Sequence, residues 1–112
     1  MSLTGEGADA FAEVTPYRDG AMYVGHYSGS SEWERHPNGE EVVIALEGTT
    51  TVVLLKSTGI ERVFLTETEL VVIPAGVWHR FEGSNQLKVL TITPQPTYHS
   101  VELPDEVGKP IA

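Results

Sequence analysis

Residues 33–48 read WERHPNGEEVVIALEG, a polar run that continues without a break into an apolar one. The second half is rich in β-branched residues, which predicts a strand. The first half holds Glu34, His36, Glu40 and Glu41 around the turn-forming residues PNG. Such an acidic stretch is most often a solvated turn, and the alternative is a metal site. The rest of the chain has to decide between the two.

Short runs rich in β-branched and aromatic residues recur along the whole chain and predict strands. They cover residues 21–27, 41–46, 50–55, 61–65, 69–73, 77–81 and 87–93. Turn-forming residues separate these runs, and their regular spacing favours a sandwich or barrel over alternating strands and helices. We therefore expect one all-β domain over residues 1–112, with an amino-terminal arm (about 1–13) and a proline-rich tail (about 94–112).

Composition excludes several classes of function. The formal net charge of −9 and the scattered Lys and Arg residues argue against nucleic-acid binding and against anionic membranes. No apolar run approaches the roughly 20 residues that span a bilayer, and the first residues do not resemble a signal peptide. We therefore expect a cytoplasmic protein. The chain has no cysteine, so any metal must be held by histidines and carboxylates.

Several of the expected strands are apolar on both faces. In EVVIAL, residues 41–46, Val43 and Ala45 share a face with Glu41, and the other face is apolar too. A small barrel buries only its inner face, so the outer face should alternate to polar residues. A chain terminus or a second subunit would cover such a face, and we expect a homodimer.

Strand phase places several polar residues together, because side chains two apart in a strand point the same way. Glu34 and His36 then share a face, and in VWHRF, residues 77–81, His79 shares one with Phe81. Pro74 and Gly76 fit a type I turn that starts at Ile73, which would set the direction of His79.

At these residues the chain resembles the cupin superfamily. ERHPNGEEVVIALEG (34–48) and TELVVIPAGVWHRFEG (68–83) are similar to the two motifs of that family, in the same order and with a short linker between them. Pro74, Gly76 and His79 match the second motif, and His36, Glu41 and Gly48 match the first. The departures are Glu34 in place of the first motif histidine, Thr68 in place of the opening glycine of the second motif, and Gly83 in place of its closing asparagine.

The resemblance implies a double-stranded β-helix, the cupin-type jelly-roll barrel. It also implies one divalent transition metal, bound by His36, Glu41 and His79 with Glu34 at the fourth position. Two histidines and a carboxylate suit Fe, Mn, Ni or Zn. We expect a metal-dependent enzyme that acts on a small organic molecule, with dioxygenase or isomerase type chemistry. The alternative is a non-catalytic module that binds or senses a small ligand, with or without metal.

Some assignments stay open at this point. Glu34 either completes the metal shell, faces solvent or pairs with an arginine, and the whole cluster is alternatively a hydrogen-bond network without metal. We expect Phe81 to form part of the pocket wall and Glu40 to lie at the surface. The tryptophans at 33 and 78 are out of phase with the ligands, which favours outer-face packing or dimer contacts. His99 in the tail is expected at the surface rather than as a ligand.

Overall fold

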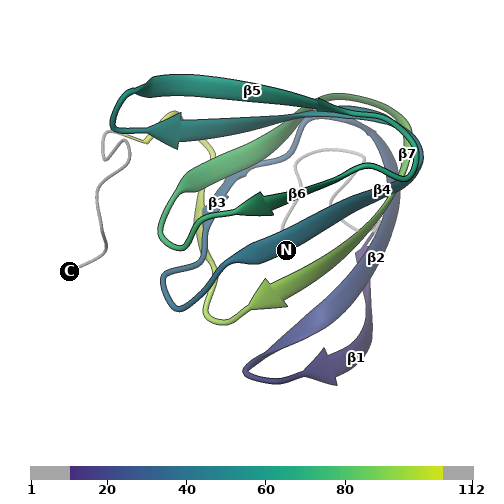
Figure 1. The fold of residues 1–112 in the computed structure, drawn as a ribbon, viewed down its shortest axis with the longest axis horizontal. Helices are drawn as coiled ribbons and strands as arrows, with labels where there is room; N and C mark the ends of the chain where they lie inside the picture. Colours follow the sequence, from purple (N-terminus) through teal and green to yellow (C-terminus); the bar gives the residue numbers. More distant parts are fainter. Residues whose placement is uncertain (1–10, 105–112) are drawn as a thin grey trace.

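A computed structural model describes residues 11–104, and these form one curled antiparallel sheet without a helix (Figure 1). Its strands are β1 (Phe11–Tyr17), β2 (Gly20–Gly29), β3 (Trp33–Arg35), β4 (Glu41–Lys56), β5 (Gly59–Leu65), β6 (Leu70–Ile73), β7 (Trp78–Pro94) and β8 (Tyr98–Ser100). The expected all-β class and the jelly-roll barrel are confirmed. Residues 1–10 of the expected arm and 105–112 of the expected tail lie outside the described residues.

The barrel has two layers that share the long strands β4 and β7. In one layer, the first half of β4 pairs with the second half of β7. β6 lies beyond β4 in this layer, and β2 and then β1 lie beyond β7. The second half of β4 and the first half of β7 pair again in the other layer, between β5 and β3, with β8 beyond β3. Each long strand therefore crosses from one layer to the other, as its course in Figure 1 shows.

This crossing corrects the predicted strand limits. Residues 41–46 and 50–55 are parts of one strand, as are 77–81 and 87–93, because the presumed turns between them are bends. The register of β4 against β7 shifts repeatedly between Ala45 and Thr51. At this bend Gly48 has φ +74°, and a Cβ there would lie 2.2 Å from the carbonyl oxygen of Gln86. Glycine is therefore required at this bend, where a side chain would clash with the backbone of β7.

The predicted turn before His79 also needs correction. The backbone N–H of Val77 donates to the carbonyl of Pro74, so the turn starts at Pro74 rather than at Ile73. Gly76 then occupies its third position with φ +78°, which is typical of a type II turn and not of type I. Thr68 has φ +71°. This backbone region favours the glycine that the second motif usually has there.

The inner face of the barrel is apolar over most of its length. Its cluster of buried side chains consists of Tyr27, Val43, Ala45, Val52, Leu54, Leu65, Ile73, Phe81, Leu87 and Val89. Phe81 is 2% exposed and packs against Tyr27 with ring centroids 6.1 Å apart. It lies inside the barrel on the face expected from strand phase.

A second, smaller cluster covers the outside of the layer that contains β3. It consists of Trp33, Val53, Leu55 and Trp78. The guanidinium groups of Arg35 and Arg80 stack 4.9 Å from the ring centroids of Trp78 and Trp33, respectively. The outer-face packing expected for both tryptophans is confirmed, and this cluster holds β3 against β7.

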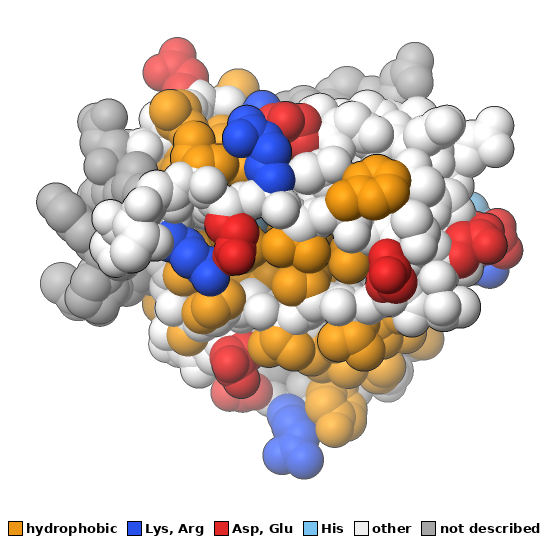
Figure 2. All heavy atoms as spheres, turned by 45° about the horizontal axis from the view of Figure 1, so that its top comes forward, with side chains coloured by type: hydrophobic (Ala, Val, Ile, Leu, Met, Phe, Trp, Pro, Cys, Tyr) orange, Lys and Arg blue, Asp and Glu red, His pale blue; other side chains and the backbone are white. Residues whose placement is uncertain are grey.

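The outside of the other layer, which contains β6, is apolar and partly exposed among the described residues. Two rows of aligned residues cross β6, β4, β7 and β2, and they consist of Val72, Val42, Ile92 and Met22, and of Leu70, Ile44, Leu90 and Val24. Leu70 is 56% exposed and Val72 is 45% exposed. Figure 2 shows hydrophobic side chains gathered on this side of the molecule, in the lower half of the view. The predicted homodimer is not tested by a single chain.

The described residues also include no helix long and apolar enough to cross a membrane. The cytoplasmic location expected from the sequence stays a prediction.

Candidate metal centre

Three strands bring the predicted ligands together inside the barrel. Glu34 in β3 lies directly opposite His79 in β7, and His36 follows β3 in the chain. Glu41 is the first residue of β4. Glu34, His36 and His79 are each 2% exposed and Glu41 is fully buried. Burial excludes the solvent-facing alternative for Glu34 and the solvated-turn interpretation of the cluster.

The polar atoms of these side chains converge on one point. One ligand atom each from Glu34, His36 and His79 lies within 4.8 Å of the other two. Oε1 of Glu41 lies 2.9 Å from Nε2 of His79 and 3.4 Å from Nε2 of His36. Oε1 of Glu34 lies 4.0 Å from Nε2 of His36. Ligand atoms bonded to one ion at about 2.0–2.1 Å are themselves roughly 3–4 Å apart, so these distances suit a shared metal.

The far side of each ligand is held by a neighbouring group. Nδ1 of His79 lies 2.9 Å from the carbonyl oxygen of Val77, and Nδ1 of His36 lies 2.9 Å from Oγ1 of Thr97. The hydroxyl of Thr93 donates to Oε2 of Glu41 at 2.5 Å. Metal-binding histidines and carboxylates are usually oriented by outer contacts of this kind. Both imidazoles thus direct Nε2 into the cluster.

The hydrogen-bond pattern of His79 calls for a proton or a metal ion beside its Nε2. A carbonyl oxygen only accepts, so Nδ1 of His79 must carry the proton that it donates to Val77. In a neutral imidazole Nε2 then presents a lone pair to Oε1 of Glu41 at 2.9 Å. Two lone pairs at that distance repel, so either a proton or a metal ion lies between them. Nε2 of His36 is buried without a hydrogen-bond partner in the same place.

The pKa values of the metal-free cluster reflect the same pairing. Burial alone would raise the pKa of Glu41, but the close approach and charge of the His36 and His79 imidazoles outweigh burial and lower it. Burial would lower the pKa of His79, but the hydrogen bond and charge of Glu41 outweigh it and raise that pKa. Without metal, both shifts favour a proton on His79 beside an ionised Glu41.

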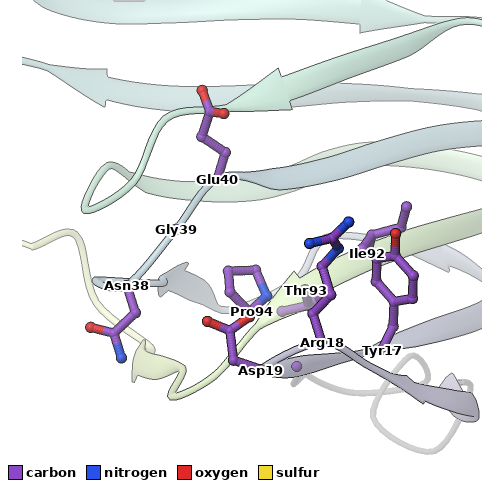
Figure 3. Close-up of a pocket in the computed structure, with 10 residues that line it drawn as sticks. Tyr17, Arg18, Asp19, Asn38, Gly39, Glu40, Ile92, Thr93 and Pro94 are labelled. Atoms are coloured by element: carbon purple, nitrogen blue, oxygen red, sulfur yellow. The ribbon is translucent and has the colours of Figure 1, made fainter.

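The structure agrees with the expectation that Glu40 lies at the surface and Glu41 does not. Glu40 is exposed and lines a surface pocket together with Asn38 and Arg18 (Figure 3). Glu41 is fully buried and contacts His79 inside the barrel. His99 is exposed, as expected, but its Nδ1 lies 3.7 Å from Oε2 of Glu34.

Sequence reasoning missed two residues that contact the cluster, Thr93 and Thr97. Thr93 is 1% exposed and follows the buried Leu87 and Val89 on the same strand face. A hydroxyl at the end of an apolar row was therefore a usable signal. Thr97 had no such signal, because it lies beyond the last predicted strand and reaches His36 only through the fold.

Comparisons with known proteins agree with this architecture. A family model described as "Cupin domain" matches residues 22–93. A cupin-2 domain containing protein from Shewanella frigidimarina NCIMB 400 is 24% identical, with a TM-score of 0.65 over 78% of this chain and 81% of that chain. No curated protein matches the sequence.

Two other similar structures are of enzymes. Hydroquinone 1,2-dioxygenase PnpCD, in complex with Cd²⁺ and 4-hydroxybenzonitrile, is 19% identical, with a TM-score of 0.66 over 83% of this chain and 68% of that chain. Oxalate decarboxylase from Bacillus subtilis, a protein with Mn(II) centres, is 15% identical, with a TM-score of 0.65 over 88% of this chain and 30% of that chain. At these identities the likeness shows the fold alone.

Proposed function

The chain belongs to the cupin domain family, and from that premise we propose that it is a metal-dependent enzyme acting on a small organic molecule. The proposal places one divalent ion, Fe, Mn, Ni or Zn, between Glu34, His36, Glu41 and His79. Such an ion would polarise a bound oxygen atom, activate water or bind dioxygen, which suits dioxygenase or isomerase type chemistry.

One observation supports the proposal above all others. Nε2 of His79 and Oε1 of Glu41 face each other at 2.9 Å while Nδ1 of His79 is committed to a carbonyl oxygen. A proton or a metal ion would relieve this contact, and the buried Nε2 of His36 is directed at the same place. A hydrogen-bond network without metal accounts for the proton on His79, but it leaves Nε2 of His36 at 3.4 Å from Oε1 of Glu41 without a well-aligned hydrogen bond.

Hydrogen bonds from neighbouring residues orient His36, His79 and Glu41 toward the position of the ion. Val77 and Thr97 orient the two imidazoles, and Thr93 occupies one oxygen of Glu41 so that the other faces the histidines. This arrangement reduces the reorganisation that binding an ion requires. Burial of the four side chains excludes water and strengthens their electrostatic interactions.

The charge of the interior favours an uncharged ligand. Glu34 and Glu41 carry two negative charges, which would offset those of a divalent ion. No lysine or arginine of the described residues is buried, so an anionic ligand finds no cationic side chain inside. Tyr27 and Phe81 are the aromatic side chains of the buried cluster inside the barrel. We therefore propose a neutral, partly aromatic small molecule rather than an organic acid.

Metal titration into chelator-treated protein tests the function. We expect one equivalent of Fe²⁺, Mn²⁺, Ni²⁺ or Zn²⁺ to bind in calorimetry, because the donors are already assembled. At an ion concentration 100 times Kd, the free energy of unfolding should rise by about 2.7 kcal/mol. Protein that binds none of these ions would refute the proposal.

The metal-loaded protein also tests the kind of ligand. Hydroquinone is expected to bind and oxalate is not, with dissociation constants that differ at least about tenfold, equivalent to roughly 1.4 kcal/mol. Tighter binding of oxalate would contradict the neutral-ligand proposal. Binding of hydroquinone without oxygen uptake or a product would favour the non-catalytic module instead.

We also propose that the partly exposed apolar face of the layer that contains β6 binds a second copy of this chain. The two rows defined above contain no charged residue, so two copies of the face can meet without charge repulsion. A twofold axis brings the same patch of both subunits together, and an exposed apolar patch of this kind is typical of such contacts.

Light scattering of Leu70→Glu tests the dimer. The wild type is expected at the mass of two chains, and Leu70→Glu at the mass of one, because a charge buried without a partner costs several kcal/mol. Ile60→Glu is the matched control, since Ile60 is 50% exposed but lies in β5 of the other layer. A monomeric wild type, or an equal effect of both variants, would argue against this interface.

A further inference from the structure

His99 lies next to the one residue of the cluster that departs from the family motif. In β3, Glu34 is paired with His79 of β7 on one side and with His99 of β8 on the other. Directly paired residues of antiparallel strands project to the same side of the sheet. Nδ1 of His99 lies 3.7 Å from Oε2 of Glu34 and 3.6 Å from Oε2 of Glu32. His99 thus lies within ion-pair distance of both carboxylates.

The two oxygens of Glu34 face different partners. Oε1 lies 4.0 Å from Nε2 of His36, inside the cluster, and Oε2 is the oxygen directed at His99. The terminal torsion of a glutamate is broad and roughly twofold, so the carboxylate plane is not fixed by its own rotamer. An outside partner on Oε2 restricts that rotation and keeps Oε1 toward the histidines.

We propose that His99 is a positioning residue for Glu34, which it holds with Oε1 presented to the metal. The proposal rests on the proposed function, because it assigns His99 a role through the ion that Glu34 would bind. A glutamate at this position is longer and more flexible than the histidine of the family motif. His99 supplies an outer contact to this glutamate by charge at 3.7 Å, where Val77, Thr97 and Thr93 hold the other three ligands by hydrogen bonds.

A purely structural ion pair would behave differently from a positioning contact. The His99 side chain is 40% exposed, and ion pairs at that exposure contribute little to stability. Removal of the imidazole should therefore leave the unfolding midpoint of metal-free protein nearly unchanged. Its effect should appear in the affinity and spectrum of the bound ion.

The test is a double-mutant cycle of His99→Ala and Glu34→Gln, measured by titration with Co²⁺ and Zn²⁺. His99→Ala should weaken binding about tenfold, the lower end of what loss of an outer contact costs. It should also shift the visible spectrum of bound Co²⁺ toward that of Glu34→Gln. In the Glu34→Gln background, His99→Ala should have no further effect. His99→Asn, which keeps a donor near the position of Nδ1, should restore wild-type affinity to within about twofold.

The outcomes separate the two proposals. His26→Ala is the control, since His26 is exposed on the strand face opposite to Tyr27. Wild type that binds metal, with His99→Ala equal to it in affinity and spectrum, would overturn the role of His99 alone. Equal effects of His99→Ala in both backgrounds would also overturn it, because the contact would not act through Glu34. Wild type that binds neither of these ions, nor Fe²⁺, Mn²⁺ or Ni²⁺, would overturn both proposals.

Discussion

Replacement of His79 by alanine is expected to abolish metal binding, with a loss of at least about 100-fold in affinity. Loss of an outer contact already costs about 10- to 100-fold, and His79 would be a direct ligand. Its Nε2 faces Oε1 of Glu41 at 2.9 Å, and its ring lies 5.1 Å from that of His36. Calorimetric titration of metal-free wild type and variant with Zn²⁺ or Mn²⁺ measures the difference.

Two further variants keep this prediction open to refutation. His26→Ala removes an exposed imidazole from β2 and should bind the ion as tightly as the wild type. His79→Gln keeps a side-chain amide near Glu41, so it is less prone to unfold than His79→Ala. Circular dichroism would show whether either variant is folded. A folded His79 variant with wild-type affinity would show that the ion, if bound, is held elsewhere.

The fold was predictable because its signals are local. Period-two alternation placed Val43 and Ala45 inside with Glu41, and all three are buried. The errors came at Gly48 and Gly83, where composition indicates a turn but the strands only bend, with φ of +74° and +62°. Glycine is the preferred residue at a positive φ, whether the chain turns there or only bends. Sequence alone could not distinguish them.

The centre of the site was predictable for the same reason, and its surroundings were not. Strand phase brought Glu34 and His36 to one face, and the motif resemblance related them to His79. The contacts of Thr97 and His99 depend on β8, which returns to pair with β3 from far along the chain. No local pattern specifies that pairing. The outer contacts that tune the ligands were therefore visible only in the structure.

Glu41→Ala is expected to destabilise metal-free protein by about 3–5 kcal/mol, the cost of removing one partner from a buried ion pair. Glu41 is fully buried, and its two oxygens meet His79 at 2.9 Å and Thr93 at 2.5 Å. The loss is a large part of the 5–15 kcal/mol that typically stabilises a domain. Urea unfolding after chelation measures it, and Glu40→Ala, an exposed neighbour, should change stability by less than about 0.5 kcal/mol.

The same variant separates a metal centre from a hydrogen-bond network. If the cluster were only a network, saturating Zn²⁺ would leave the difference in stability between wild type and Glu41→Ala unchanged. If Glu41 is a ligand, the ion stabilises the wild type and not the variant, so the difference should grow by about 2.7 kcal/mol at an ion concentration 100 times Kd. A loss below about 1 kcal/mol without metal would contradict the ion pair itself, because a buried charge pair that costs so little to break is not formed.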